Sequence, residues 1–179
     1  MKKYFCLVYS FILLLFASNG LSAENKMHAC SLLTSDEIGS AIGGGQVGQS
    51  QERDIVIPEG PLKGKTMGVC MWPTHDKQGM VSVNIISVPQ GAQRTEGLAK
   101  LNEAFEKLKA KGWTEEKKEF GNTKCVIMTP PSSEKNVPIL TTCIGETKGM
   151  GTSVGSMSRN KVSIEKVKML LDKVMGRIH

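Results

Sequence analysis

The sequence predicts an α+β domain: a single antiparallel sheet of about five or six strands, with helices packed on one face. The composition is that of an ordinary globular chain, with 179 residues, 40% of them hydrophobic and 22% charged. Amphipathic helical patterns occur near the start, the middle and the end of the chain. Alternating β-type segments separated by short turns lie between them, and such turns join antiparallel strands. The expected order is α-β-β-α-β-β-β-β-α, in one domain over residues 24–179 with two disulfides.

Residues 1–23 have the pattern of a secretory signal peptide. Lys2 and Lys3 form a basic start, an apolar stretch follows from Cys6 to Phe16, and Ala23 provides a small residue at the cleavage site. The apolar stretch is too short to span a bilayer, and no later apolar run is long enough. We therefore expect a soluble periplasmic or secreted protein without a transmembrane segment.

Four cysteines remain after the predicted cleavage, an even number that is typical of two disulfides in an exported protein. An antiparallel hairpin centred on Glu134 would place Cys125 opposite Cys143, and directly opposed residues bring their Cα atoms within disulfide range. This pairing leaves Cys30 with Cys70. No C-x-x-C spacing occurs, which favours a structural role over a redox or metal-binding one.

The first half of the mature chain begins with a clear helix signal. Thr34 and Glu37 form a capping box ahead of a helix over Ser35–Ile42, which ends at the glycines that follow. The polar segment Gln46–Lys65, rich in glycine and proline, predicts an exposed connection. Strands are then expected at Gly68–Pro73 and Met80–Val88.

The Thr74–Gly79 turn joins these two strands as a hairpin.

The central helix is expected from about Thr95 to Lys111 and ends at Gly112, because apolar residues recur there at intervals of three and four. The apolar stripe of this helix consists of Leu98, Leu101, Phe105 and Leu108. The polar segment Trp113–Phe120, which follows the helix, predicts a strand near an edge of the sheet.

Three further strands and a helix complete the chain. The strands are expected at Thr123–Thr129, Ile139–Thr147 and Gly151–Met157, and Gly151 and Gly155 would admit close packing of a helix on one face. Ser163 caps the last helix, which we expect on the same sheet face as the central helix. Its apolar stripe consists of Ile164, Val167, Leu170, Leu171 and Val174.

Two short motifs resemble those of a family of uncharacterised bacterial cell-envelope proteins. They are Cys30-Ser-Leu-Leu-Thr-Ser-Asp-Glu-Ile-Gly-Ser-Ala-Ile-Gly43 and, later, Cys70-Met-Trp72. Many members of that family are actinobacterial lipoproteins that contain a domain of unknown function. The resemblance implies that Cys30 and Cys70 are bridged, but this chain lacks the lipobox. The family carries no established chemistry.

A cluster of soft ligands makes the first hairpin a candidate metal site. Met67, Met71, His75 and Met80 are candidate ligands for copper(I), which prefers thioether and imidazole groups. Neighbouring strand residues point to opposite faces, so Cys70 cannot join Met71 on one metal without distortion. Methionine is also an ordinary core residue, which is the interpretation we favour.

A recognition surface is the second candidate site. Trp72, Pro73 and His75 could form it together with the long segment Gln46–Lys65, although core packing is favoured for Trp72. Charges of both signs alternate along the chain, which argues against a nucleic-acid partner. No G-x-S-x-G or H-E-x-x-H motif occurs, so we expect neither an enzyme nor a cofactor.

The sequence thus favours an exported, non-enzymatic module that binds an envelope protein or a small ligand. The alternative is a periplasmic copper-binding protein that uses the Met/His hairpin.

Overall fold

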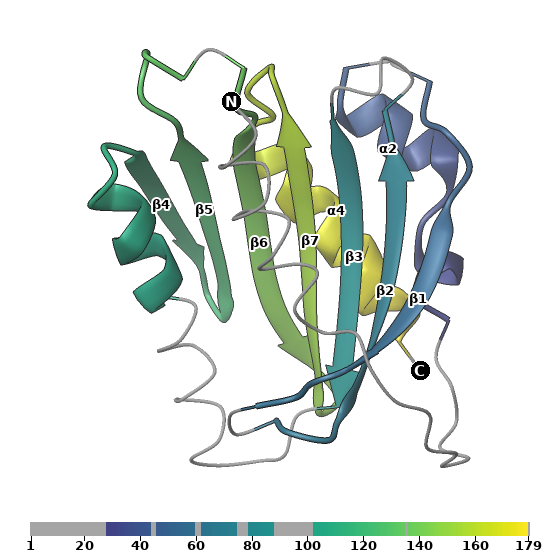
Figure 1. Ribbon diagram of the computed structural model, residues 1–179. Helices are drawn as coiled ribbons and strands as arrows, with labels where there is room; N and C mark the ends of the chain where they lie inside the picture. The colour runs from purple at the N-terminus through teal and green to yellow at the C-terminus, as the bar shows by residue number, and fades with distance from the viewer. Residues whose placement is uncertain are drawn as a thin grey trace.

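The computed structural model describes residues 28–43, 46–59, 62–74, 79–87, 102–134 and 136–178. Within these ranges the chain forms one seven-stranded sheet of order β1-β2-β3-β7-β6-β5-β4, in which every neighbouring pair is antiparallel (Figure 1). The strands are β1 (Gln51–Val56), β2 (Thr66–Pro73), β3 (Met80–Ser87), β4 (Thr114–Phe120), β5 (Thr123–Thr129), β6 (Ile139–Thr147) and β7 (Met150–Ser158). The helices are the 3-10 helix η1 (Ala29–Leu32), α2 (Ser35–Ala41), a helix at residues 102–109 and α4 (Ile164–Arg177).

The prediction of five or six strands is wrong, because β1 lies inside the segment that we expected to be an exposed connection. This strand pairs with β2 along its whole length. Five of its six side chains are exposed and only Ile55 is buried. An edge strand is held by the backbone of its one neighbour, so its side chains need not alternate between apolar and polar. That is why the sequence pattern did not reveal it.

One face of the sheet carries the main core. Trp72, Val83, Ile127 and Val154 point to this face, where α4, α2 and η1 pack against them. Figure 1 shows α4 running behind the central strands. The capping box of α2 and the Ser163 cap of α4 are both present. The apolar stripe predicted for the last helix is buried at Ile164, Val167, Leu170, Leu171 and Val174.

The helix at residues 102–109 packs on the opposite face, so the expectation that the helices share one face is also wrong. Phe105 and Leu108 contact a second, smaller cluster that contains Val126 and Met128. Successive strand residues point to opposite faces, and on β5 the alternate residues Cys125 and Ile127 lie in the main core. Because β5 is apolar on both faces, its sequence could not indicate which face each helix covers.

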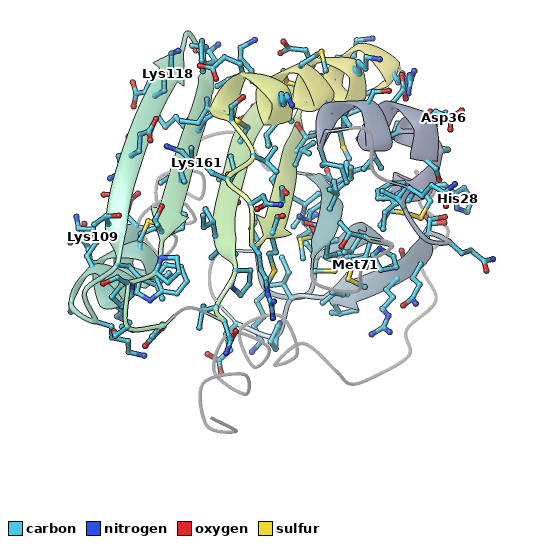
Figure 2. The ribbon with its side chains drawn as sticks, turned by 90° about the horizontal axis from the view of Figure 1, so that it is seen from above. His28, Asp36, Met71, Lys109, Lys118 and Lys161 are labelled. Atoms are coloured by element: carbon cyan, nitrogen blue, oxygen red, sulfur yellow. A yellow bond between two sulfur atoms is a disulfide. The ribbon has the colours of Figure 1, made fainter. Side chains whose placement is uncertain are left out.

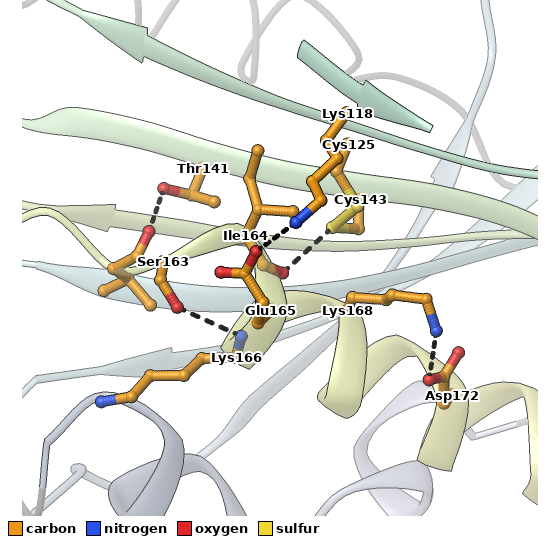
Figure 3. The surroundings of a disulfide bond; sticks show 11 residues. Lys118, Cys125, Thr141, Cys143, Ser163, Ile164, Glu165, Lys166, Lys168 and Asp172 are labelled. Carbon is orange, nitrogen blue, oxygen red and sulfur yellow. Dashed lines mark hydrogen bonds and ion pairs between the residues drawn. A yellow bond between two sulfur atoms is a disulfide. The ribbon is translucent and has the colours of Figure 1, made fainter. Parts of the chain in front are cut away.

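Both disulfides are present with the predicted pairing, Cys30–Cys70 and Cys125–Cys143. Cys125 and Cys143 are directly opposed across β5 and β6, as a hairpin centred on Glu134 requires. Figure 3 shows this bridge beside the start of α4. There the Cys143 sulfur lies 3.8 Å from the Ile164 carbonyl oxygen, so the cross-link supports the docking of α4.

An ion cluster joins the start of the described chain to its last helix. The Glu37 carboxylate accepts hydrogen bonds from both guanidinium nitrogens of Arg177 at 2.8 Å and from Lys173 Nζ at 2.8 Å. Arg177 also donates to the Leu32 carbonyl oxygen at 2.7 Å. Arg177 foremost, then Lys173 and the Thr34 backbone N–H, hold the pKa of Glu37 far below its usual range.

Candidate functional site

The sheet face opposite α4 carries a strip of uncharged side chains along its two central strands. We call the residues of β3 and β7 on this face the neutral strip. They alternate with core residues such as Val83 and Val154, and the register places them in facing pairs. The neutral strip consists of Met80, Ser82, Asn84 and Ile86 on β3, facing Met157, Gly155, Ser153 and Gly151 on β7.

The middle of the neutral strip is built from small polar groups. A Cβ atom placed on Gly155 would lie 3.3 Å from Ser82 Oγ and 3.4 Å from Thr142 Oγ1, so two hydroxyl groups converge over this glycine. One row further along, Asn84 Nδ2 donates a hydrogen bond to Ser153 Oγ at 3.0 Å. These side chains therefore form a small hydrogen-bonding surface that is half-buried.

Larger apolar side chains flank this surface on both sides. Half-buried Met71 of β2 lies beside Ser82, and Val69, which is itself buried, lies beside Asn84. Ile144 of β6 faces Ser153 on the other side. The helices α2, α4 and η1 contribute to the core on the other face, and the helix at residues 102–109 packs over the β5–β6 end. None of these four helices therefore covers the neutral strip.

The absence of charge distinguishes the neutral strip from a solvated strand face. β3 and β7 contain no Asp, Glu, Lys or Arg at all, whereas the edge strand β4 has the sequence TEEKKEF. A strand face that only meets water is ordinarily rich in such residues. Neutral donors and acceptors between apolar flanks are instead typical of ligand sites.

The candidate copper ligands lie on this same face of the sheet. Figure 2 shows Met71 on the side of the sheet away from α4. Met71 faces Ser82 and is therefore a diagonal neighbour of Met80, which itself faces Met157. Met67 is four residues from Met71 along the same strand, or about 13 Å, too far for one metal to bind both sulfurs. The copper site remains a prediction, and among its described candidates the closest pair is Met71 and Met80.

Two of the predicted recognition residues, Trp72 and Pro73, point to opposite faces of the sheet. Trp72 is 1% exposed and belongs to the main core, as the core interpretation expected. Pro73, the next residue along β2, points to the opposite face beside Met80. His75 lies outside the described residues. Asn84 and Ser153 were not singled out from the sequence, although the alternation of polar and apolar residues in β3 already indicated which of its side chains leave the core.

Charged groups at the β4 edge of the sheet form paired contacts. Glu115 on β4 lies 3.3 Å from Lys109 of the helix at residues 102–109 and 2.9 Å from Lys117. Burial raises the pKa of the Glu115 carboxyl, but Lys117 and Lys109 outweigh burial and lower it overall. Within the described ranges, no group of three or more His, Cys, Asp or Glu side chains is placed to hold a metal ion. No helix in that part of the chain is both long and apolar enough to cross a membrane.

The fold and this surface together define a class: a disulfide-linked antiparallel sheet with α4, α2 and η1 on one face and the half-buried neutral strip on the other. The described architecture is similar to that of a solved structure, the extracellular domain of PknH from Mycobacterium tuberculosis. The two share a TM-score of 0.55 at 13% sequence identity, over 82% of this chain and 92% of that one. The likeness shows a shared fold. No model of a known protein family matches the chain, and no curated protein sequence is significantly similar to it.

Proposed function

We propose that the protein is an exported, non-enzymatic binding module that takes an envelope protein or a small ligand on the neutral strip. The observation that carries this proposal is the chemistry of β3 and β7, where uncharged hydrogen-bonding groups lie between apolar flanks. Such a surface can bind a ligand through hydrogen bonds and apolar contacts together.

Export is supported by the two disulfides, because these bonds persist in oxidising compartments outside the cytosol. The signal-peptide pattern of residues 1–23 agrees with this placement. The solved domain with the similar fold is itself extracellular. We therefore place the module in the periplasm or outside the cell.

A binding role is favoured over catalysis by the surroundings of the two serines on the neutral strip. Ser153 accepts a hydrogen bond from the Asn84 amide, and Ser82 lies beside Gly155 and Thr142. None of these neighbours can act as a general base for a serine nucleophile, which needs a histidine, carboxylate or amine within hydrogen-bond reach. The same groups are well suited to orient a bound ligand.

Blocking the neutral strip tests the proposal. We expect Ser153→Leu to abolish binding in a screen of envelope components by ligand-observed NMR, because the larger side chain covers the Asn84 amide. Ser133→Leu is the matched control, since Ser133 is exposed in the turn before β6. A ligand that binds both variants and the unaltered protein equally would place the binding site elsewhere and refute the proposal.

A further inference from the structure

We propose that the neutral strip recognises an extended, uncharged peptide segment of about six residues, whose amide groups pair with Asn84 and Ser153. This inference rests on the proposed function and names the class of ligand for the same surface. Three features carry it: the hydrogen-bonding groups that the Asn84–Ser153 pair leaves available, the charge of the surface, and its dimensions.

The Asn84–Ser153 pair presents one acceptor and one donor side by side. Asn84 Nδ2 donates to Ser153 Oγ at 3.0 Å, which fixes the relative orientation of the two side chains. The carbonyl oxygen of Asn84 can still accept a hydrogen bond, and the hydroxyl hydrogen of Ser153 can still be donated. A peptide group offers the complement, one N–H and one C=O, so it can satisfy both partners at once.

The charge of the surface excludes ionic ligands. A charged group placed over β3 and β7 would lose its hydration without gaining an opposite charge, which is costly. The charged side chains nearest the neutral strip already have partners in the protein. Glu146 of β6, which faces Gly151 at one end of the strip, and Arg53 of β1 are both engaged, and Lys124 is 3.6 Å from Glu119. An uncharged ligand avoids this penalty.

The dimensions of the surface fit one extended chain. The rows from Met80 to Ile86 extend over about 20 Å at the rise of a β-strand, which matches about six extended residues. Between β2 and β6 the sheet spans three strand spacings, or about 14 Å, which accommodates one chain with its side chains. The flanking Met71 is flexible and adapts to different apolar side chains.

Other neutral ligands fit this surface less well. Flat ring compounds are usually held by stacking on an aromatic side chain. On this face, the described residues of β2, β3, β7 and β6 include no Phe, Tyr or Trp, because Trp72 points into the core. Hydrogen bonding combined with apolar contact, as a peptide provides, remains the chemistry that these strands can supply.

The test uses a pool of N-acetylated, C-amidated hexapeptides built from Ala, Gly, Ser, Val and Leu, added to the purified full-length protein labelled with ¹⁵N. We expect the pool to shift the side-chain amide signals of Asn84. We also expect Asn84→Asp to weaken binding at least about tenfold, which corresponds to about 1.4 kcal/mol. In that variant the Ser153 hydroxyl donates to the new carboxylate, so the pair loses its free donor and gains a charge. Asn160→Asp is the control, because it makes the same change at an exposed site after β7.

Two further probe sets separate this inference from the proposed function. A pool that leaves the Asn84 signals unchanged, or that binds Asn84→Asp as well as the unaltered protein, overturns the peptide inference. The peptide inference is also overturned if a neutral hexasaccharide or charged hexapeptides shift the Asn84 signals more strongly than the neutral pool does. That result would still leave the neutral strip as the binding site. If Asn84→Asp does not fold, the signal shifts in the unaltered protein decide alone.

Discussion

Valine substitution at Gly145 and, separately, at Gly155 tests which face of the sheet carries the core and which is free to bind. The two glycines lie on the neighbouring strands β6 and β7 but point to opposite faces. Gly145 lies beneath α4, whereas Gly155 is in the middle of the neutral strip. The same change in the same kind of strand should therefore have very different effects on stability.

At Gly145 the added side chain meets packed atoms. A Cβ atom there would lie 2.8 Å from Met175 Sδ and 3.3 Å from Leu171 Cδ2. Met175 can move, but Leu171 is fully buried and cannot withdraw. Overpacking of this kind costs about 1–3 kcal/mol of the free energy of unfolding. The higher β-propensity of valine offsets at most about 1 kcal/mol of that cost.

At Gly155 the added side chain meets two hydroxyl groups that can rotate away. The nearest atoms to a Cβ there are Ser82 Oγ at 3.3 Å and Thr142 Oγ1 at 3.4 Å. The propensity gain is the same as at Gly145, so we expect Gly155→Val to change the free energy of unfolding by less than about 1 kcal/mol. The difference between the two variants isolates the contact with α4, and we expect it to be about 2 kcal/mol.

Urea unfolding followed by circular dichroism measures both variants under the same conditions. We expect a lower midpoint for Gly145→Val, with an unchanged slope, and a midpoint near that of the unaltered protein for Gly155→Val. Equal midpoints for the two variants, or a larger loss for Gly155→Val, would show that the neutral strip is packed against another part of the chain. That result would remove the basis for a binding surface there.

Three further predictions concern the ion cluster, a disulfide and the copper alternative. Glu37→Gln should cost about 1 kcal/mol at pH 7. Because the pKa of Glu37 is lowered far below its usual range in the fold, its contribution is fully present above the ordinary value of about 4.3 and declines as the pH falls below that value. The difference between the urea midpoints of variant and parent should therefore shrink steadily below about pH 4. The double variant C125A/C143A should lower the free energy of unfolding by about 3 kcal/mol in denaturant titration. If the copper site exists, Met80→Leu should weaken copper(I) binding, measured in competition with a chromogenic chelator. Met169→Leu is the control, because Met169 lies on an exposed side of α4. Equal copper(I) affinities of the two variants would reject the copper site.

Local patterns predicted most of the secondary structure. The hairpin that joins β5 and β6 was predicted with its register, because the β-rich segments and the prolines between them fix its centre at Glu134 and two cysteines confirm it. The helix that begins at Ser163 was likewise determined by its cap and its apolar stripe. Signals of this kind are contained within a few residues and do not depend on distant partners.

The features that were missed depend on which other segment each element packs against or pairs with. β1 is a strand because β2 pairs with it, not because Gln51–Val56 favours a strand. An amphipathic stripe shows that a helix is buried on one side, but not which face of a sheet it covers. The Asn84–Ser153 hydrogen bond joins residues that are 69 apart in sequence, and it exists only because β7 pairs with β3.

The position of β7 connects the binding surface to the stability of the fold. β7 lies between β3, which belongs to the first half of the chain, and β6, which belongs to the second. A ligand seated across β3 and β7 contacts both halves and can bind only when they are paired. Such a ligand binds the folded state alone, so it must raise the free energy of unfolding in proportion to the logarithm of its concentration above its Kd. A compound that binds the protein without this stabilisation therefore does not bridge Asn84 and Ser153.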